Sequence, residues 1–198
     1  MDAVERVVAA LGRGEPVILP TDTVYGLCAA PDEEASARAY AVKGRNVAQP
    51  TALIASTVAA LKAAVPELDE RILEALLPGA YTLVLPNPDK RYPWLTGARP
   101  DTIGVRVPRL PDPARRVLDA VGCVLATSAN EPGEPAPARL DQIPARIRAA
   151  CGAELDVGEL PGVASTVLDF TGAEPVVIRE GAASATDAVA CVRAALGR

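Results

Sequence analysis

The sequence predicts a single α/β domain in which helices flank a sheet of mixed parallel and antiparallel strands. Segments with helical spacing of apolar residues alternate with short apolar runs over most of the 198 residues. Several steps between successive runs are too short for a helical crossover, so the sheet is not purely parallel. With 49% hydrophobic residues, the chain has enough apolar material for one core. No repeat and no linker divides residues 1–198, which we expect to form one domain.

The first half of the chain begins with a helix over 2–12, where Val4, Val7 and Leu11 follow the N-cap candidate Asp2 at helical spacing. Residues 16–20 enclose an apolar run between two prolines, which is typical of a buried strand. Further along, the pattern predicts a helix over 32–43, a strand over 51–55, helices over 58–65 and 67–77, and a strand over 81–85.

The second half opens with a loop over 87–101, rich in proline, glycine and charge, which leads to a strand over 102–107. A second loop, over 128–139, contains three prolines. Around these loops the pattern predicts helices over 113–121, 139–150 and 186–196, and strands over 123–127, 165–170 and 176–179.

The composition excludes several classes of function. The chain has no histidine, which removes Ser-His-Asp and Cys-His nucleophiles and HExxH zinc sites. Its net charge of -5 provides no global field for nucleic acid or anionic membrane, so a bound anion must meet a local patch. The four cysteines are far apart and predict reduced core thiols. Without a basic leader or an apolar run of roughly 18 residues, the protein is expected in the cytoplasm, away from membranes.

Polar residues follow the predicted strands, where ligand sites gather in open α/β sheets. The first cluster, Thr21-Asp22-Thr23, leaves the strand over 16–20 and is either a turn with side-chain-to-backbone bonds or part of a site. The second, Lys43-Gly44-Arg45, ends a helix, and its cations either complement the helix dipole or clamp a phosphate or carboxylate.

Three further clusters lie later in the chain. Thr102 and Arg106 share one face of a strand, and a covered Arg106 needs an anion from the protein or from a ligand. Ser128 and Asn130 leave the strand over 123–127 and either cap the next segment or bind phosphate oxygens and base edges. The weakest cluster joins Ser165-Thr166 to Arg179-Glu180-Gly181, if the two late strands pair.

Standard phosphate loops and metal cages are missing from the sequence. It contains neither GxxxxGK[ST] nor a GxGxxG that opens a helix after a strand. The isolated acids predict no protein-held metal, so a divalent ion would arrive with a nucleotide's phosphates.

In this order, the segments PTDTVYGL, KGR, LLPGAYTLVL, TIGVRVP, TSAN, STV and IREGA resemble the YrdC/Sua5 family of threonylcarbamoyl-AMP synthases. The resemblance runs from about residue 15 to about residue 183 and is closest to the short, single-domain form. It implies a twisted YrdC/RibB-like sheet that curves around a positively charged ligand cavity. It also implies a nucleotidyltransferase that joins L-threonine, bicarbonate or CO2, and ATP into threonylcarbamoyl-AMP and pyrophosphate.

The resemblance also implies roles for individual residues. Lys43 and Arg45 would be catalytic, acting on the phosphates from the edge of the cavity, where Lys43 would hold no core together. L-Threonine would be bound by Thr23, Arg106, Ala126 and Ser165. ATP, with Mg²⁺ and without a tightly bound cofactor, would meet Lys43, Arg45, Gln49, Thr102, Ser128, Asn130 and Arg179. The product would pass to a tRNA threonylcarbamoyltransferase complex that makes N6-threonylcarbamoyladenosine at position 37 of tRNA.

Departures from the family pattern keep other hypotheses open. The family commonly reads KGRPxxNPL where this chain reads KGRNVAQPTAL, so Gln49 replaces an asparagine, and Ile54 stands where two-domain members can have histidine. One alternative is a paralogue of the same fold that binds RNA or a nucleotide without synthase activity. Another is a carbamoyl-transfer module of the hydrogenase-maturation type. For direct contact with tRNA, Arg139, Arg146 and Arg148 form either a local basic patch or a solvated helix face.

Overall fold

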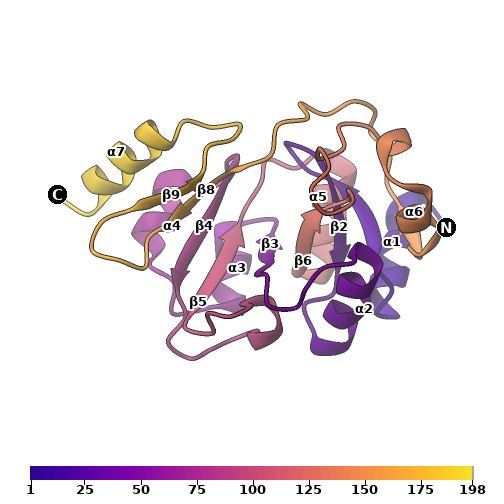
Figure 1. Cartoon of the computed structure of the whole chain (residues 1–198), viewed down its shortest axis with the longest axis horizontal. Coiled ribbons are helices and arrows are strands. Elements are labelled where there is room, and N and C mark those ends of the chain that lie inside the picture. Colours follow the sequence, from indigo (N-terminus) through magenta and orange to yellow (C-terminus); the bar gives the residue numbers. More distant parts are fainter. Residues whose placement is uncertain (198) are drawn as a thin grey trace.

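A computed structural model describes residues 1–197 and shows one mixed sheet with helices packed on both faces (Figure 1). The central apolar runs form strands because their β-branched and leucine side chains are buried on both sides of the sheet, whereas Val176, Val177 and Ile178 at the sheet edge are exposed. The strands are β1 (Val17–Pro20), β2 (Tyr25–Ala29), β3 (Ala52–Ala55), β4 (Tyr81–Pro86), β5 (Thr102–Arg106), β6 (Cys123–Ser128), β7 (Ala153–Glu154), β8 (Thr166–Asp169) and β9 (Val176–Arg179).

The helices begin and end at the capping residues that the sequence provides. Asp2 forms a capping box with Glu5 at the start of the first helix, and Asp32 caps the second. The α-helices are α1 (Ala3–Gly12), α2 (Glu33–Lys43), α3 (Val58–Ala64), α4 (Glu70–Leu76), α5 (Asp112–Val121), α6 (Ala145–Ala149) and α7 (Ala185–Ala195). Two short 3₁₀ helices, η1 (Pro93–Leu95) and η2 (Leu140–Gln142), lie in the long loops.

The strand order is β7-β1-β2-β6-β3-β5-β4-β8-β9. The pairs β1–β7, β3–β5 and β4–β8 are parallel, and the other neighbouring pairs are antiparallel. This confirms the predicted mixed sheet. The crossovers bring the ends of β5 and β6 next to the β1–β2 turn, so residues far apart in sequence meet on one face.

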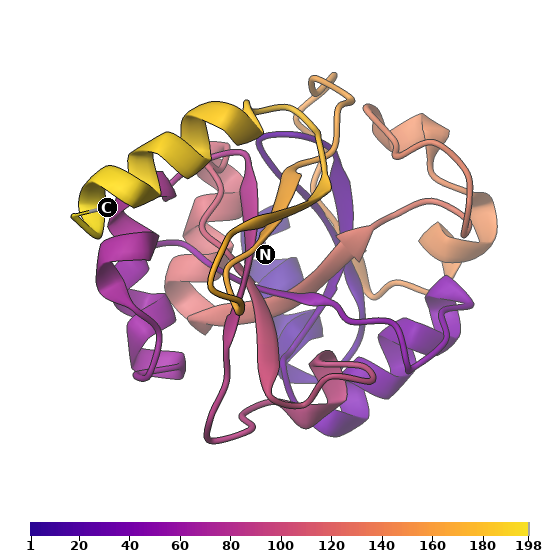
Figure 2. The ribbon, with the colours of Figure 1, turned by 60° about the vertical axis from the view of Figure 1, so that its left-hand side comes forward.

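One face of the sheet is covered by α3, α4 and α7. Leu53, Val105 and Leu125 point to this face and pack against Leu61 of α3 and Leu73 of α4. Figures 1 and 2 both place α7 beside α4, although the two helices are far apart in the sequence. The result is the largest buried core of the molecule.

The other face is only partly covered by helices. There α1 and α5 pack over Val17, Cys28, Ile54 and Val124. Beyond this cluster, the same face carries small and polar side chains, among them Ala52, Gly104 and Ala126. Because no helix fills that part, it is left concave, and the candidate site lies there.

The structure departs from the predicted elements in three places. Residues 25–29, for which no strand was predicted, form the central strand β2, because Leu27 and Cys28 bury against neighbouring strands. The single helix predicted over 139–150 is divided into η2 and α6 at Pro144, which has no N–H to donate and caps α6 instead. The short strand β7 also lies outside the predicted strands.

No helix within residues 1–197 combines the length and the apolar character that crossing a membrane requires.

Candidate active site

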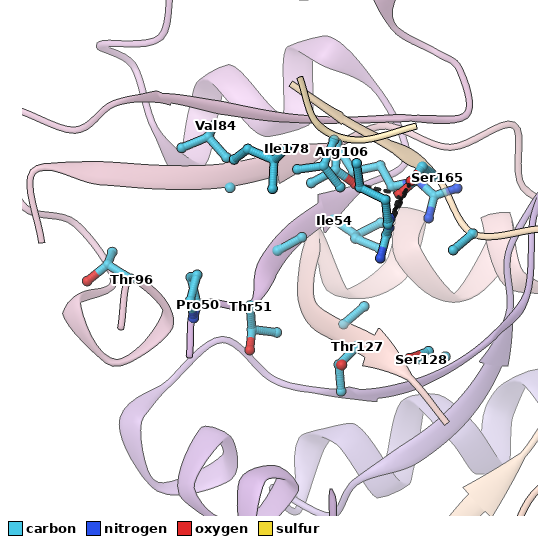
Figure 3. A pocket seen from close by; sticks show the side chains of 18 of the residues that line it. Pro50, Thr51, Ile54, Val84, Thr96, Arg106, Thr127, Ser128, Ser165 and Ile178 are labelled. Atoms are coloured by element: carbon cyan, nitrogen blue, oxygen red, sulfur yellow. Dashed lines mark hydrogen bonds between the residues drawn. The ribbon is translucent and has the colours of Figure 1, made fainter. Parts of the chain in front are cut away.

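A cavity of about 410 Å³ occupies the concave part of the sheet (Figure 3). Its walls come from the β1–β2 turn, the segment between α2 and β3, and strands β3, β4, β5, β6, β8 and β9. A second recess of about 380 Å³ shares Arg45, Pro50 and Ser128 with it. Together the two spaces have the size typical of a site for one or two small molecules.

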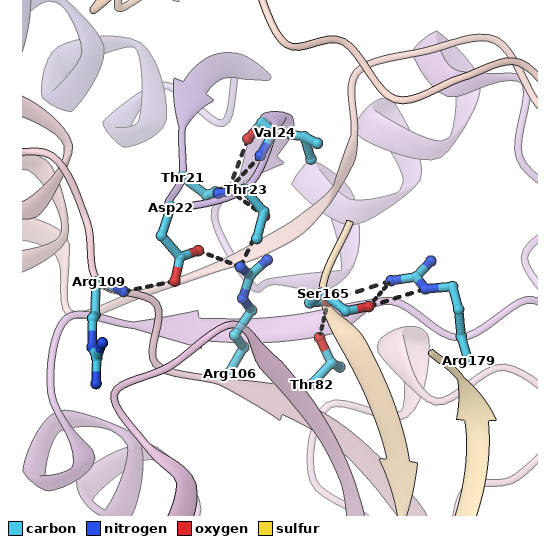
Figure 4. Close-up of polar contacts among 9 residues, drawn as sticks. All are labelled: Thr21, Asp22, Thr23, Val24, Thr82, Arg106, Arg109, Ser165 and Arg179. Carbon is cyan, nitrogen blue, oxygen red and sulfur yellow. Dashed lines mark hydrogen bonds and ion pairs between the residues drawn. The ribbon is translucent and has the colours of Figure 1, made fainter. Parts of the chain in front are cut away.

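Arg106 forms one end of the cavity from the last position of β5. Its Nη2 atom donates to the Asp22 carboxylate and to Thr23 Oγ1 at 2.9 Å (Figure 4). The residue is only 6% exposed, and its Nε–H is buried with no acceptor in the described part of the chain. Burial lowers the pKa of Arg106, while the Asp22 carboxylate opposes that shift. A buried donor without a partner is costly, so this end is suited to an anionic oxygen.

Asp22 and Thr23 are held by a rigid turn between β1 and β2. Thr21 Oγ1 donates to the carbonyl of Val24 at 2.7 Å and accepts from the backbone N–H groups of Thr23 and Val24. The second oxygen of Asp22 accepts from the backbone N–H of Arg109 at 3.0 Å. The turn with side-chain-to-backbone bonds is confirmed, and it directs Asp22 and Thr23 toward Arg106.

The two late strands bring Ser165 and Arg179 together beside Arg106. Strands β8 and β9 pair, which confirms the weakest of the predicted clusters. Arg179 donates from Nε and Nη2 to the carbonyl of Ser165 at 3.0 and 2.8 Å, and Thr82 Oγ1 lies 2.8 Å from Ser165 Oγ (Figure 4). Gly181 permits this approach, since a Cβ there would lie 2.2 Å from the carbonyl oxygen of Ala164.

The opposite end is formed where α2 ends and β6 ends. Gly44, with φ +65°, terminates α2 in the left-handed conformation and turns Arg45 toward the cavity. Arg45 donates to Thr127 Oγ1 at 3.3 Å and to the carbonyl of Pro50 at 2.6 Å, and burial lowers its pKa. This end therefore offers a guanidinium beside hydroxyl and amide groups.

We expected Lys43 to lie at the edge of the cavity and to stabilise no part of the core, but the structure buries its side chain. It is only 3% exposed, and its Nζ donates to the carbonyls of Ser128 (2.7 Å) and Asn130 and to Asn130 Oδ1 (2.6 Å). Burial, with a smaller effect of Arg45, lowers the pKa of Lys43 to about 8.

The residues implied by the resemblance meet around this cavity, but not all of them line it. Arg45, Thr102, Arg106, Ala126, Ser128, Ser165 and Arg179 line the main cavity. Lys43, Gln49 and Asn130 line the recess. Thr23 is buried behind Arg106 and reaches the site through it.

The sequence analysis missed several polar residues of the cavity wall, among them Arg99 and Thr82. Arg99 lines the cavity and pairs with Asp169 at 2.8 Å, and Thr82 positions Ser165. Arg99 lies in an irregular loop without a motif, so no sequence signal marks it. Thr82 could have been found from the alternation of β4, because it and Val84 face away from the core residues Leu83 and Leu85.

Metal ligands and a free basic patch are both missing from the described residues. No group of three His, Cys, Asp or Glu side chains within residues 1–197 could hold a metal ion. The arginines considered for tRNA contact each pair with an acid, namely Arg139 with Asp141, Arg146 with Glu131 and Arg148 with Glu154. This arrangement fits a solvated face better than a free basic patch.

Comparison with known proteins identifies the family. The model of the Sua5/YciO/YrdC family, described as "Telomere recombination", matches residues 9–181. The chain belongs to the Sua5/YciO/YrdC family. A putative threonylcarbamoyl-AMP synthase of Mycobacterium leprae is 34% identical over 182 residues, which cover 89% of this chain and 82% of that protein. The threonylcarbamoyl-AMP synthase of Pyrococcus abyssi is 35% identical, but this chain spans only 53% of its length.

Solved structures of the family share the fold. The crystal structure of P. abyssi Sua5 complexed with L-threonine matches with a TM-score of 0.83 and 30% identity, over 98% of this chain and 58% of that one. The crystal structure of E. coli YciO matches with a TM-score of 0.82 and 26% identity, over 93% and 91% of the two chains. Two chains of HypF, at 20% identity, share only the fold.

Proposed function

We propose that this protein is an L-threonylcarbamoyladenylate synthase, which uses L-threonine, bicarbonate or CO2, and ATP. Relatives that cover most of the chain bear the name threonylcarbamoyl-AMP synthase, and a structural neighbour binds L-threonine. The observation that carries the proposal is the cavity itself. It has a buried guanidinium with an unpaired Nε–H at one end and a second cationic group at the other.

The amino-acid end is assigned to Arg106, Ala126, Ser165 and, through Arg106, Thr23. The threonine carboxylate would accept from the free Nε–H of Arg106, because Nη2 already donates to Asp22 and Thr23. Ser165 offers a hydroxyl and Ala126 leaves room beside it. This arrangement leaves the threonine amine free to face the rest of the cavity.

The ATP end is assigned to Arg45, Gln49, Thr102, Ser128 and Arg179, supported by Lys43 and Asn130. The threonine amine attacks the carbon of CO2 or bicarbonate to form a carbamate. With CO2 the amine releases a proton to solvent, and with bicarbonate a water molecule leaves the carbon. The carbamate oxygen then attacks the α-phosphorus. The bond from the α-phosphorus to the bridging oxygen breaks, and pyrophosphate leaves. Arg45 and Arg179 offset the repulsion between these anions and the charge that develops on the leaving group, which needs positioning and electrostatics rather than a proton shuttle. Mg²⁺ enters with ATP as part of the substrate.

The product is a mixed anhydride that a transferase must consume, and we propose the tRNA threonylcarbamoyltransferase complex as its acceptor in the cytoplasm. A direct contact with tRNA would gain little from Arg139, Arg146 and Arg148, which are already paired with acids.

Pyrophosphate release from ATP by the purified protein tests the proposal. Release that requires both L-threonine and bicarbonate, and that falls when serine replaces threonine, is the expected result. The altered KGRNVAQP segment favours one competing function, a paralogue without synthase activity. ATP or RNA binding without dependent pyrophosphate release would establish that paralogue instead.

A further inference from the structure

Lys43 has no hydrogen left for a phosphate in this structure. An ammonium group has three N–H donors. All three are directed at oxygens of one segment, namely the carbonyls of Ser128 and Asn130 and the side-chain Oδ1 of Asn130. The pairing of a lysine at the end of α2 with the end of β6 therefore joins two segments that are 85 residues or more apart in the chain.

The same contacts fix the orientation of Asn130. Its Oδ1 accepts from Lys43 Nζ and from Ser128 Oγ, each at 2.6 Å, while its Nδ2 donates to the carbonyl of Glu134. The segment 128–134, which we call the β6 exit loop, thus closes on itself around the amide of Asn130. Ser128, Asn130, Pro132 and Gly133 of this loop line the recess next to the main cavity.

A second cation joins the loop to α2 from outside. Arg146 of α6 binds the Glu131 carboxylate and donates to the carbonyl of Val42 at 2.6 Å. Lys43, which is buried, joins the same loop to α2 from inside the protein. Because the loop has no strand or helix of its own after Ser128, these contacts determine its position against α2.

We propose that Lys43 is a positioning residue, which holds the β6 exit loop in place through Asn130 so that Ser128 and Arg45 meet ATP. The proposal rests on the proposed function and refines it, since the phosphate contact falls to Arg45 while Lys43 acts from behind. Lys43 would then govern the binding of ATP and not that of threonine, which lies at the Arg106 end.

The test compares Lys43→Ala, Asn130→Ala and the double variant, with Lys62→Ala as the matched control. Lys62 also donates to two carbonyls, those of Pro66 and Leu68, each at 2.7 Å, but it does not line the cavity or the recess. The measurements are the ATP and threonine concentrations at half-maximal pyrophosphate release, and hydrogen exchange of the amides of residues 128–134.

Each single variant should raise the half-saturating ATP concentration by on the order of tenfold or more and leave the threonine value within about twofold. The half-saturating ATP concentration of the double variant should be no higher than that of the more severe single variant, because both substitutions remove the same contact between Lys43 and Asn130. Exchange in the β6 exit loop should accelerate in all three. Lys62→Ala should change none of these.

The proposal would be overturned in favour of a direct phosphate contact by two results together. The increases in half-saturating ATP concentration of the single variants would multiply in the double variant, and the loop amides of Lys43→Ala would exchange as slowly as those of the wild type. If Lys43→Ala does not fold, Lys43→Met keeps the apolar stem, and Asn130→Ala breaks the same connection from the other side. If the wild type releases no pyrophosphate, the proposed function fails, while the exchange measurements still decide whether Lys43 positions the loop.

Discussion

Arg106 is the side chain on which the proposed amino-acid end of the site depends. The sequence marked it as an arginine in an apolar strand that needs an anion. The structure supplies one from the protein itself, because Asp22 accepts from Nη2, while Nε has no acceptor within residues 1–197. Buried charges are retained where they are paired and hydrogen-bonded, so the remaining Nε–H donor forms a preorganised place for a carboxylate.

Replacing Arg106 by alanine should raise the half-saturating threonine concentration by on the order of hundredfold, because hydrogen bonds to charged groups contribute about 1.5–3 kcal/mol each. The half-saturating ATP concentration should change much less. Pyrophosphate release, titrated with threonine and separately with ATP, measures the two values. Arg109→Ala is the matched control, since its guanidinium points away from Arg106 (Figure 4). An unchanged threonine dependence in Arg106→Ala would remove this residue from the amino-acid site.

Single residues also show where sequence reasoning reached its limit. The residue types at both ends of the site were visible in the strand-end clusters, and the resemblance grouped them. The sequence did not show which hydrogen-bond donor pairs with which acceptor. The burial of Lys43 against Asn130 and the pairing of Asp22 with Arg106 depend on crossovers that bring distant segments together.

Strand β5 shows how an element of the fold creates space for substrates. Thr102, Gly104 and Arg106 alternate onto the cavity face, while Ile103 and Val105 enter the core. A Cβ at Gly104 would lie 3.7 Å from Ala52 Cα, which is ordinary contact, so the fold itself would accept a methyl group there.

Gly104→Ala should therefore leave the free energy of unfolding unchanged or raise it by up to about 1 kcal/mol, yet impair turnover. Forcing a methyl group into occupied space costs about 1–3 kcal/mol, so the half-saturating substrate concentration should rise roughly tenfold or more. Urea unfolding and pyrophosphate release measure the two effects. Gly12→Ala, at the end of α1 with no atom within 4 Å of its Cβ, should leave turnover intact. A Gly104→Ala protein with wild-type turnover would show that substrates do not approach β5.

At the element scale, periodicity predicted the helices and strands with strong apolar patterns and failed where tertiary contacts decide. Strand β2 contains Gly26 and follows a polar turn, so its local signal is weak, but pairing with β1 and β6 makes it central. Conversely, 139–150 carries a helical pattern that Pro144 interrupts, and this proline should have limited the prediction.

The four cysteine thiols of the protein differ in how deeply they are buried. Cys28 and Cys123 are buried and Cys151 is partly buried, but Cys191 is exposed on α7, so the prediction of four core thiols was wrong for Cys191. Burial raises the pKa of Cys28 to about 12, that of Cys123 to about 11 and that of Cys151 to about 12, so these three remain protonated at neutral pH.

Labelling of the native protein with a thiol-reactive disulfide at neutral pH should give one fast phase, from Cys191. Cys151 should react slowly, and Cys28 and Cys123 only after unfolding in urea, because burial disfavours the thiolate and blocks access. Cys191→Ser should abolish the fast phase. A fast labelling phase that remains in Cys191→Ser would show that the regions burying the other three cysteines open readily to the reagent.

At the scale of the whole molecule, the proposed function places an amino-acid end and a nucleotide end in one cavity, and its central claim is that a single carbon joins their ligands there. The most direct measurement supplies ¹³C-labelled bicarbonate with L-threonine and ATP and analyses the products by mass spectrometry. We predict labelled threonylcarbamoyl-AMP in amounts equal to the pyrophosphate released, and its loss in Arg106→Ala at low threonine. Pyrophosphate and AMP released without any labelled adenylate, in a reaction quenched before hydrolysis of the product, would contradict the claim.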